Sequence, residues 1–309
     1  MRIVFMGTPD FSVDCLKALV ASKHDIVGVF CQPDKPVGRK QELTPPDVKV
    51  EALKHGLDVY QPASLKNGKG VEILDALNPD LVVVVAYGKI LPDDFLAYPK
   101  YGCINVHASI LPKYRGASPI HYAVLNGDKI TGVTVQQMDS GIDTGDILGV
   151  KECEIGINDT TEYMYEVLAP LGAEVLMETI DLIENGQLNP VKQDESKASK
   201  VGLLNKEMSN IDWNNTAFNI HNKIRGLYSW PGASTKLNGK TLKIHSSFLS
   251  DKTGNNNPGE VIDCNGKLIV SCGDNNSVEL KTVQLEGKKR MDAAVFLNGY
   301  AIEIGTVLG

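Results

Sequence analysis

Asp80–Tyr87, with the sequence DLVVVVAY, is an almost unbroken apolar run that includes four consecutive valines. A strand that is covered on both faces has this pattern, whereas a half-exposed strand alternates apolar and polar residues. Short apolar runs alternate with amphipathic, helix-like segments around it, which is typical of a doubly wound α/β sheet. The other predicted strands lie at 2–7, 26–31, 57–60, 102–107, 131–138 and 146–155, and predicted helices lie at 11–22 and 160–184.

The second part of the chain has a different pattern. Residues 185–202 are polar and without a clear period, which indicates an exposed linker. A helix-like segment at 214–227 is followed by short apolar runs between Gly and Asn turns, at 233–237, 240–249, 259–264, 267–272 and 276–285. Such short strands predict a small β-barrel of the OB-like type. We therefore expect a first domain at 1–189, a linker at 190–205 and a second domain at 206–309.

The composition excludes several classes of protein. Hydrophobic residues make up 42% of the chain and charged residues 22%, as in ordinary globular proteins. No apolar run is long enough to span a membrane, and the N-terminal MRIVFMG reads as a strand, so we expect a cytoplasmic protein without membrane contact. Six scattered cysteines without a C-x-x-C motif favour reduced thiols over a disulfide framework or a zinc site.

The net charge of −7 is divided unevenly along the chain. Residues 206–309 carry 12 Lys and Arg against 10 Asp and Glu, a net charge of +2, which leaves −9 for residues 1–205. This asymmetry suits a division of labour between the two parts. Ordinary variation of surface charge between domains accounts for it equally well.

Asn105–Arg115, NVHASILPKYR, begins at the end of a predicted strand. Because side chains in a strand alternate between its faces, Asn105 and His107 are predicted to point the same way. Open α/β sheets bind ligands at the carboxyl ends of their strands. An asparagine there can donate to a developing oxyanion, and a histidine can donate or act as a base.

The following strand leads into MDSGIDTGDIL at 138–148, which contains Asp139, Asp143 and Asp146. If that strand neighbours 102–107, one of the three carboxylates can reach His107 and hold its imidazole in one tautomer. Asp and Gly are also ordinary turn residues. Chemistry alone does not choose among the three aspartates.

Two further segments concern phosphate binding. The first βα turn, MGTPDFS, has only Gly7 of the three glycines in a dinucleotide fingerprint, which argues against a Rossmann-type dehydrogenase. The long Pro- and Gly-containing loop 32–49 carries Lys35, Arg39 and Lys40. Basic residues on such a loop suit a phosphate-bearing partner, although a plain solvated surface loop has the same composition.

Several motifs resemble the methionyl-tRNA formyltransferase family, and the resemblance covers essentially the whole chain. In the first part they are NVHASILPKYRGASPI, MDSGIDTGDIL, MGTPDFS and QPDKPVGR; in the second they are IDWNNTAFNIHNKIRGLYSWPGA and GKKRMDAAVFLNG. The H-x-S-x-L-P and D-x-G-D parts are shared by the 10-formyltetrahydrofolate-dependent formyltransferases. The loop and the C-terminal motifs narrow the likeness to the enzymes that act on initiator tRNA.

The resemblance implies a Rossmann-like formyltransferase domain, a linker and an OB-like barrel. It implies a catalytic set that falls on Asn105, His107 and Asp143. The implied folate-binding segment falls on Ser109, Ile110, Leu111 and Pro112. The resemblance implies that Arg39 meets the acceptor stem, and together with the other basic residues of its loop, Lys35 and Lys40, it forms the predicted tRNA-binding set. SILP stands where SLLP is commoner, and LYSWP stands where LNPWP is usual; the second departure leaves only the local C-terminal packing in doubt.

The implied reaction moves the formyl group of 10-formyltetrahydrofolate to the α-amine of methionyl-initiator tRNA through a tetrahedral intermediate. It calls for no metal ion, and we expect a monomer. A glycinamide-ribonucleotide or sugar formyltransferase would share the Asn-His-Asp set, but the first lacks a C-terminal barrel and the second does not need the basic loop. A non-catalytic RNA-binding protein is the alternative from another class, and retention of all three catalytic residue types argues against it.

Overall fold

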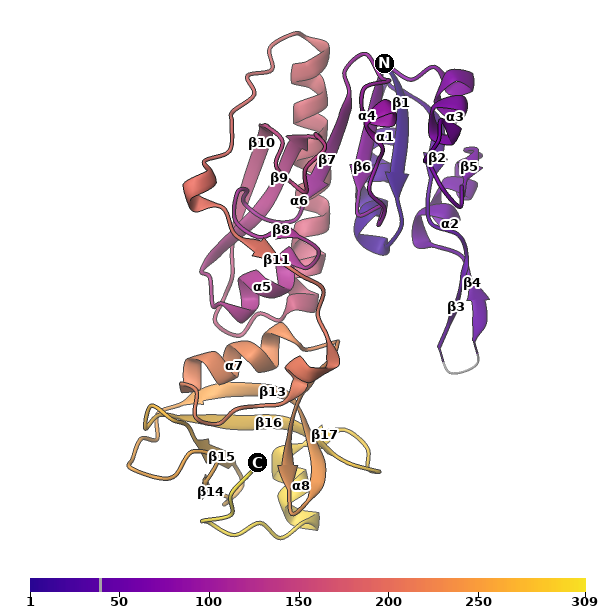
Figure 1. Ribbon diagram of the computed structural model, residues 1–309. Coiled ribbons are helices and arrows are strands. Elements are labelled where there is room, and N and C mark those ends of the chain that lie inside the picture. Colours follow the sequence, from indigo (N-terminus) through magenta and orange to yellow (C-terminus); the bar gives the residue numbers. More distant parts are fainter. Residues whose placement is uncertain (39–40) are drawn as a thin grey trace. The chain divides into compact units, whose positions relative to one another are not determined.

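The computed structural model describes residues 1–38 and 41–309 (Figure 1). These residues form two compact units. Unit 1 consists of Met1–Gly116, Thr131–Cys153 and Tyr165–Val201. Unit 2 consists of Ala117–Ile130, Glu154–Met164 and Gly202–Gly309. Among the described residues, no helix is long and apolar enough to cross a membrane.

Unit 1 is built on a seven-stranded sheet with the order β10-β9-β7-β6-β1-β2-β5. Its strands are β1 (Arg2–Gly7), β2 (Asp25–Phe30), β5 (Val59–Tyr60), β6 (Leu81–Val85), β7 (Cys103–His107), β9 (Ile130–Gln137) and β10 (Ile147–Glu154). β1 pairs in parallel with β2 and β6, β6 with β7, and β2 with β5, whereas β9 is antiparallel to β7. This parallel-rich sheet confirms the α/β, Rossmann-like class predicted from the sequence.

Helices cover both faces of this sheet, which explains the apolar sequence of β6. All five residues of β6 are buried. Val4 and Met6 of β1 share an apolar cluster with Leu74 of α3 (Lys69–Leu77) and Phe95 of α4 (Asp93–Leu96). On the other face, Gly172 of α6 (Thr161–Glu184) approaches β7 and β9 so closely that a Cβ there would lie 3.3 Å from Val106 and 3.7 Å from Val133.

The segment 32–49 contains more structure than the predicted loop. β3 (Lys35–Val37) and β4 (Glu42–Thr44) form an antiparallel hairpin whose six residues are exposed. At its base, Lys49 of α2 (Asp47–Lys54) donates to Asp34 at 2.8 Å. This ion pair therefore connects the residue that precedes β3 to the helix that follows β4.

The remaining short elements of unit 1 are η1 (Asp10–Ser12), α1 (Val13–Val20), β8 (Arg115–Gly116), η2 (Glu195–Lys197) and β11 (Lys200–Val201). Two further short elements, α5 (Pro119–Leu125) and η3 (Lys206–Ser209), belong to unit 2. Within the segment 190–205, for which the sequence predicts a linker, β11 pairs in parallel with β8. This part of the chain is therefore bound to unit 1 by backbone hydrogen bonds as far as Val201.

Unit 2 contains an antiparallel sheet that curls into a half-barrel, with the order β12-β13-β16-β15-β14 and β17 paired with β16 (Figure 1). The elements are α7 (Ala217–Gly226), β12 (Ala233–Leu237), β13 (Lys240–Ser250), β14 (Val261–Asp263), β15 (Leu268–Ser271), β16 (Ser277–Leu285), β17 (Met291–Asp292) and α8 (Ala293–Gly299). The register between β13 and β16 shifts on both sides of Ser246, and irregularities of this kind increase strand curvature. The sequence predicted β12 to β16 and α7, but not β17 or α8.

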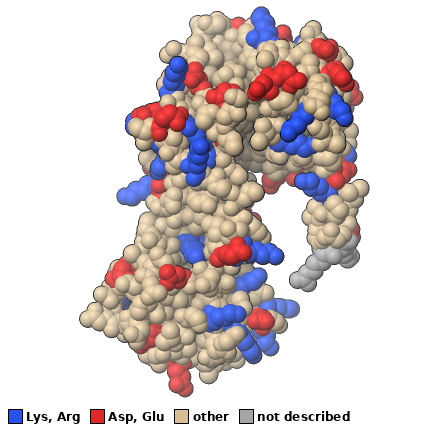
Figure 2. All heavy atoms as spheres, in the orientation of Figure 1, with Lys and Arg blue, Asp and Glu red and all other residues tan. Residues whose placement is uncertain are grey.

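Basic side chains gather on the visible face of unit 2 (Figure 2). The end of the ladder formed by β13 and β16 carries several exposed ones, namely Lys236, Lys240, Lys243, Lys288, Lys289 and Arg290. We call these six residues the basic ladder end. Arg290 also donates to the hydroxyl of Tyr228 at 2.9 Å.

Candidate active site

The candidate site begins at the carboxyl end of β7. Asn105 lies in register with Val84 of β6 on one side and with Gln136 of β9 on the other. His107 is the last residue of the strand and is buried, whereas Asn105 is half-buried. The two side chains occupy the same face of β7, as expected for residues two apart in a strand.

Asp143 meets both of these side chains. Nδ2 of Asn105 donates to Oδ1 of Asp143 at 3.4 Å, and Nδ1 of His107 lies 3.6 Å from Oδ2. By contrast, Asp139 accepts hydrogen bonds from the backbone of Gly141 and the hydroxyl of Thr144, within its own turn. The structure therefore brings together the three residues of the predicted catalytic set and gives Asp139 a turn role.

The loop that carries Asp143 is tightly folded. Asp143 has a φ of +54°, a conformation that non-glycine residues seldom adopt and that is enriched at functional sites. A Cβ on Gly145 would lie 1.6 Å from the carbonyl oxygen of Gln137 at the end of β9. Glycine is required there because the loop backbone passes directly against the strand.

Asp143 has two further hydrogen-bond partners that the sequence did not predict. Nε2 of Gln136 donates to Oδ1 at 2.8 Å, and the backbone N–H of Gly116 donates to Oδ2 at 2.8 Å. Gln136 is buried, and its Oε1 has no hydrogen-bond partner within the described residues. Gln136 is one of several polar residues in the predicted strand 131–138, and only the register with Asn105 shows that it faces the site.

The hydrogen bonds of His107 fix its neutral tautomer. Its Nε2 lies 2.9 Å from the carbonyl oxygen of Tyr114, and a carbonyl can only accept. Nε2 therefore carries a hydrogen in both the neutral and the charged ring. In the neutral ring, Nδ1 is left with a free lone pair beside Asp143, so Nδ1 is the atom that can gain and lose a proton.

The predicted folate-binding segment follows β7 directly. Ser109 and Leu111 are buried, and the hydroxyl of Ser109 donates to the carbonyl of Lys113 at 2.6 Å. Ile110 and Pro112 are half-buried. Of these four side chains, only those of Ile110 and Pro112 are therefore accessible to a ligand.

A loop that the sequence analysis did not single out also begins at this edge of the sheet. β6, the parallel neighbour of β7, leads into residues 86–91. Ala86 and Gly88 have positive φ values of +48° and +85°, and the side chain of Ile90 is 80% exposed. The unusual backbone and the exposed apolar side chain mark this loop as a second candidate for ligand contact.

Of the three predicted tRNA-binding residues, the structure describes Lys35. Lys35 begins β3 and is exposed. Arg39 and Lys40 lie outside the described residues. Within the described part of the hairpin, Lys35 therefore offers its side chain to a partner.

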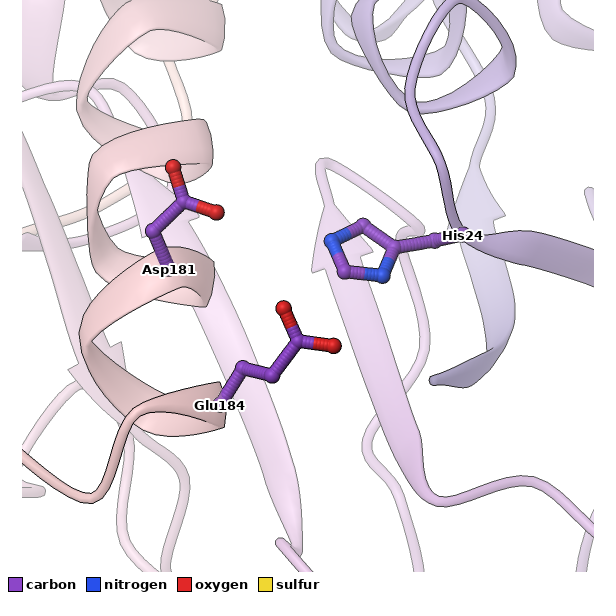
Figure 3. A group of neighbouring side chains, drawn as sticks. All are labelled: His24, Asp181 and Glu184. Atoms are coloured by element: carbon purple, nitrogen blue, oxygen red, sulfur yellow. The ribbon is translucent and has the colours of Figure 1, made fainter.

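A second titratable cluster lies elsewhere in unit 1, where the ring of His24 faces the carboxylates of Asp181 and Glu184 (Figure 3). These residues have metal-ligating side chains, but two positively charged groups, the Lys23 ammonium and the amino group of Met1, already contact them. Lys23 lies 2.6 Å from Glu184, and the amino group of Met1 lies 3.2 Å from Nδ1 of His24. Burial and the neighbouring amino group lower the pKa of His24. The cluster acts as an ion-pair clamp between the start of β1 and the end of α6.

Both parts of the chain match known protein families. Residues 1–180 match the family model described as Formyl transferase, and residues 203–301 match Formyl transferase, C-terminal domain. Curated proteins from Alkaliphilus oremlandii and Caldanaerobacter subterraneus subsp. tengcongensis, both named methionyl-tRNA formyltransferase, are 45% and 46% identical to the chain over 309 residues. Each match covers 100% of both sequences.

A solved structure shares the fold over nearly the whole chain. WlaRD, a sugar 3N-formyl transferase crystallised in the presence of dTDP and 5-N-formyl-THF, has a TM-score of 0.71 at 23% identity. The alignment covers 94% of this chain and 99% of WlaRD. Because its identity is low, this likeness supports the fold, whereas the full-length curated relatives define the family. The chain therefore belongs to the methionyl-tRNA formyltransferase family.

Proposed function

We propose that this enzyme takes the formyl group from N10 of 10-formyltetrahydrofolate and transfers it directly to the α-amino group of methionyl-initiator tRNA, in the cytoplasm. The full-length relatives support formyl transfer to methionyl-tRNA. The folate donor is supported by the formyl-folate with which WlaRD was crystallised. The observation that carries the catalytic assignment is the meeting of Asn105 and His107 at Asp143, at the carboxyl end of β7.

The reaction needs a donor for a developing oxyanion. The amine nitrogen forms a bond to the formyl carbon, and the carbonyl oxygen becomes negatively charged in the tetrahedral intermediate. Asn105 is half-buried on β7, two residues before the end of the strand, where its amide can donate to that oxygen. Its bond to Asp143 in the free enzyme is long, at 3.4 Å, so Nδ2 exchanges it at little cost for a contact with substrate.

The reaction also moves one proton. The attacking nitrogen must lose a proton, and N10 must gain one when the bond from the formyl carbon to N10 breaks. Nδ1 of neutral His107 accepts the first proton and returns it to N10, so the ring ends as it began. Asp143, 3.6 Å from Nδ1, stabilises the ring while it is charged. Because an α-amino group has an ordinary pKa of about 7.7–8.0, its deprotonation at neutral pH is a small demand.

The formyl donor is proposed to lie against the segment that follows β7 and the loop that follows β6. Ile110 and Pro112 offer accessible apolar side chains, and Ile90 is exposed on the neighbouring loop. Apolar contacts of this kind suit a flat ring system. Ser109 and Leu111 support the donor indirectly, because they hold the backbone of this segment.

The tRNA is proposed to contact both basic surfaces. Lys35, Arg39 and Lys40, the basic residues of the segment 32–49, contact the acceptor stem, and the ion pair between Asp34 and Lys49 fixes the base of the hairpin on which Lys35 lies. The basic ladder end of unit 2 provides phosphate contacts that add affinity without taking part in the chemistry. The second domain, proposed at 206–309, thus serves the larger substrate.

The acceptor is tested by a formylation assay with the full chain. Formyl transfer from 10-formyltetrahydrofolate is measured with charged initiator tRNA, charged elongator methionyl-tRNA, a nucleotide-linked amino sugar and glycinamide ribonucleotide. We expect transfer to initiator methionyl-tRNA to exceed transfer to every other acceptor. Faster transfer to the sugar or to the ribonucleotide would contradict the proposed acceptor.

A further inference from the structure

The backbone of the Asp143 loop is held by a side chain from the segment predicted as a linker. Nε2 of Gln193 donates to the carbonyl oxygen of Asp143 at 2.9 Å and to that of Gly145 at 2.7 Å. A side-chain amide nitrogen carries two hydrogens, so both are used. The two bonds bridge the turn around Thr144 and fix the backbone from which the Asp143 carboxylate projects.

The other end of the same amide is also fixed. Oε1 of Gln193 accepts from Nε of Arg115 at 3.0 Å. Arginine can only donate and backbone carbonyls can only accept, so the amide has a single orientation that satisfies all its partners. Gln193 therefore couples Arg115 to the Asp143 loop through a defined geometry.

Arg115 is itself anchored. It is buried, and its two terminal nitrogens bind the carboxylate oxygens of Glu195 at 3.0 Å and 2.6 Å. Hydrogen bonding to Glu195 is the main cause that raises the pKa of Arg115. A two-pronged arginine–carboxylate pair has a restricted geometry, which holds the guanidinium plane for Gln193.

The same part of the chain reaches Asp143 by a second route. Gly116, next to Arg115, donates its backbone N–H to Oδ2 of Asp143. Its φ is +112°, and a Cβ there would lie 2.2 Å from the carbonyl oxygen of Val201. Because β8 pairs with β11, residues 193–201 set both the backbone of Asp143 and one partner of its carboxylate.

We infer that Gln193, oriented by Arg115 and Glu195, is a positioning residue for Asp143 in formyl transfer. The inference rests on the role proposed above for Asp143. A displaced carboxylate would still bind substrates at the same surfaces, but it would stabilise the charged His107 ring less. We call the contacts that lead from Glu195 through Arg115 and Gln193 to the Asp143 loop the relay. Loss of the relay should therefore lower kcat and leave the KM values for the folate donor and for tRNA nearly unchanged.

Gln193→Glu separates the two ends of the relay. The glutamate keeps an oxygen for Arg115, but it replaces Nε2 with an oxygen that faces the carbonyls of Asp143 and Gly145. Gln187→Glu introduces the same charge at an exposed side chain earlier in the same segment, and it is the matched control. Glu195→Ala, at a side chain that is 71% exposed, removes the carboxylate that holds the buried Arg115, so its folding is verified by thermal unfolding.

The experiment measures kcat, both KM values and thermal unfolding for these variants, alone and combined with Asp143→Asn. We expect Gln193→Glu to lower kcat about 10- to 100-fold. We expect Glu195→Ala to act in the same direction, Glu195→Gln to recover part of the loss, and Gln187→Glu to resemble wild type. In the Asp143→Asn background, Gln193→Glu should change kcat less than about twofold, because both changes act through one carboxylate.

Two results would overturn the inference. One is a wild-type kcat in both folded variants, Gln193→Glu and Glu195→Ala. The other is an undiminished effect of Gln193→Glu in the Asp143→Asn background, which would show that the relay acts elsewhere. High activity of Asp143→Asn alone would instead contradict the proposed catalytic role of Asp143, on which the inference depends.

Discussion

Nδ1 of His107 lies 3.6 Å from Oδ2 of Asp143, on the side of the ring opposite to the hydrogen bond that fixes Nε2. This relationship leaves one ring nitrogen for proton transfer and places a carboxylate beside it. It also puts the proton-carrying atom on the same strand face as the amide of Asn105. The proposed chemistry follows from these three side chains and the backbone that holds them.

Asn105→Ala should act mainly on turnover. The contact between Nδ2 and the oxyanion forms as the tetrahedral intermediate develops, so its loss should lower kcat by about 10²- to 10³-fold. KM for the folate donor should stay close to the wild-type value. Steady-state kinetics with varied folate check this prediction, and unchanged turnover with a raised KM would mean that Asn105 only binds substrate.

Arg39 should contribute more than charge to tRNA recognition. Arg39→Leu removes both the charge and the planar fork of the guanidinium, whereas Arg39→Lys keeps only the charge. We expect both to impair formylation of initiator tRNA, with lysine restoring little. Rates are measured over a range of salt concentrations. Wild-type activity in Arg39→Leu would remove Arg39 from the mechanism, and full rescue by lysine would reduce its role to a phosphate contact.

The basic ladder end should bind phosphates of the tRNA. A variant with Lys288→Gln and Lys289→Gln is expected to raise KM for tRNA, leave kcat unchanged and reduce the salt dependence of binding by up to about one phosphate contact per lysine. Lys252→Gln, at the opposite end of the ladder of β13 and β16, removes one positive charge elsewhere in unit 2 and is the control. An equal rise of KM in the control would contradict a localised contact surface.

The clamp at Glu184 should give a pH-dependent contribution to stability. A hydrogen bond from Lys23 is the main cause that lowers the pKa of Glu184 in the folded protein. Its contribution is therefore fully present above the pKa of the unfolded chain, about 4.3, and is lost as the pH falls through the folded value. Urea unfolding should show Glu184→Gln less stable than wild type at neutral pH, with the difference vanishing in acid. A difference that persists at low pH would contradict this linkage.

The sequence predicted the buried elements better than the exposed ones. β1, β6 and β7 are apolar runs buried in the sheet, so periodicity locates them within a residue or two. β3 and β4 have three residues each, all exposed, and Pro36 weakens their strand pattern, so they were predicted only as a loop. The ion pair between Asp34 and Lys49 at the base of the hairpin is likewise encoded by no local pattern.

The candidate site shows the same division. Strand alternation correctly placed Asn105 and His107 on one face. Only the family resemblance favoured Asp143 over Asp139 and Asp146. Which aspartate reaches His107 depends on the shape of the loop, whose backbone at Gly145 passes directly against Gln137, and no local sequence pattern predicts that shape. Gln193 lies far from Asp143 in the sequence, and nothing in the polar segment around it indicated that its side chain reaches the loop.

The central claim is that His107, supported by Asp143, carries the proton during formyl transfer. Its most direct measurement is the single-turnover rate of transfer from 10-formyltetrahydrofolate to charged initiator tRNA by His107→Ala, at saturating concentrations and with folding verified by thermal unfolding. We expect the rate to fall by at least about 10²-fold, with tRNA binding unchanged. A near-wild-type single-turnover rate in the folded His107→Ala variant would contradict the proposed mechanism.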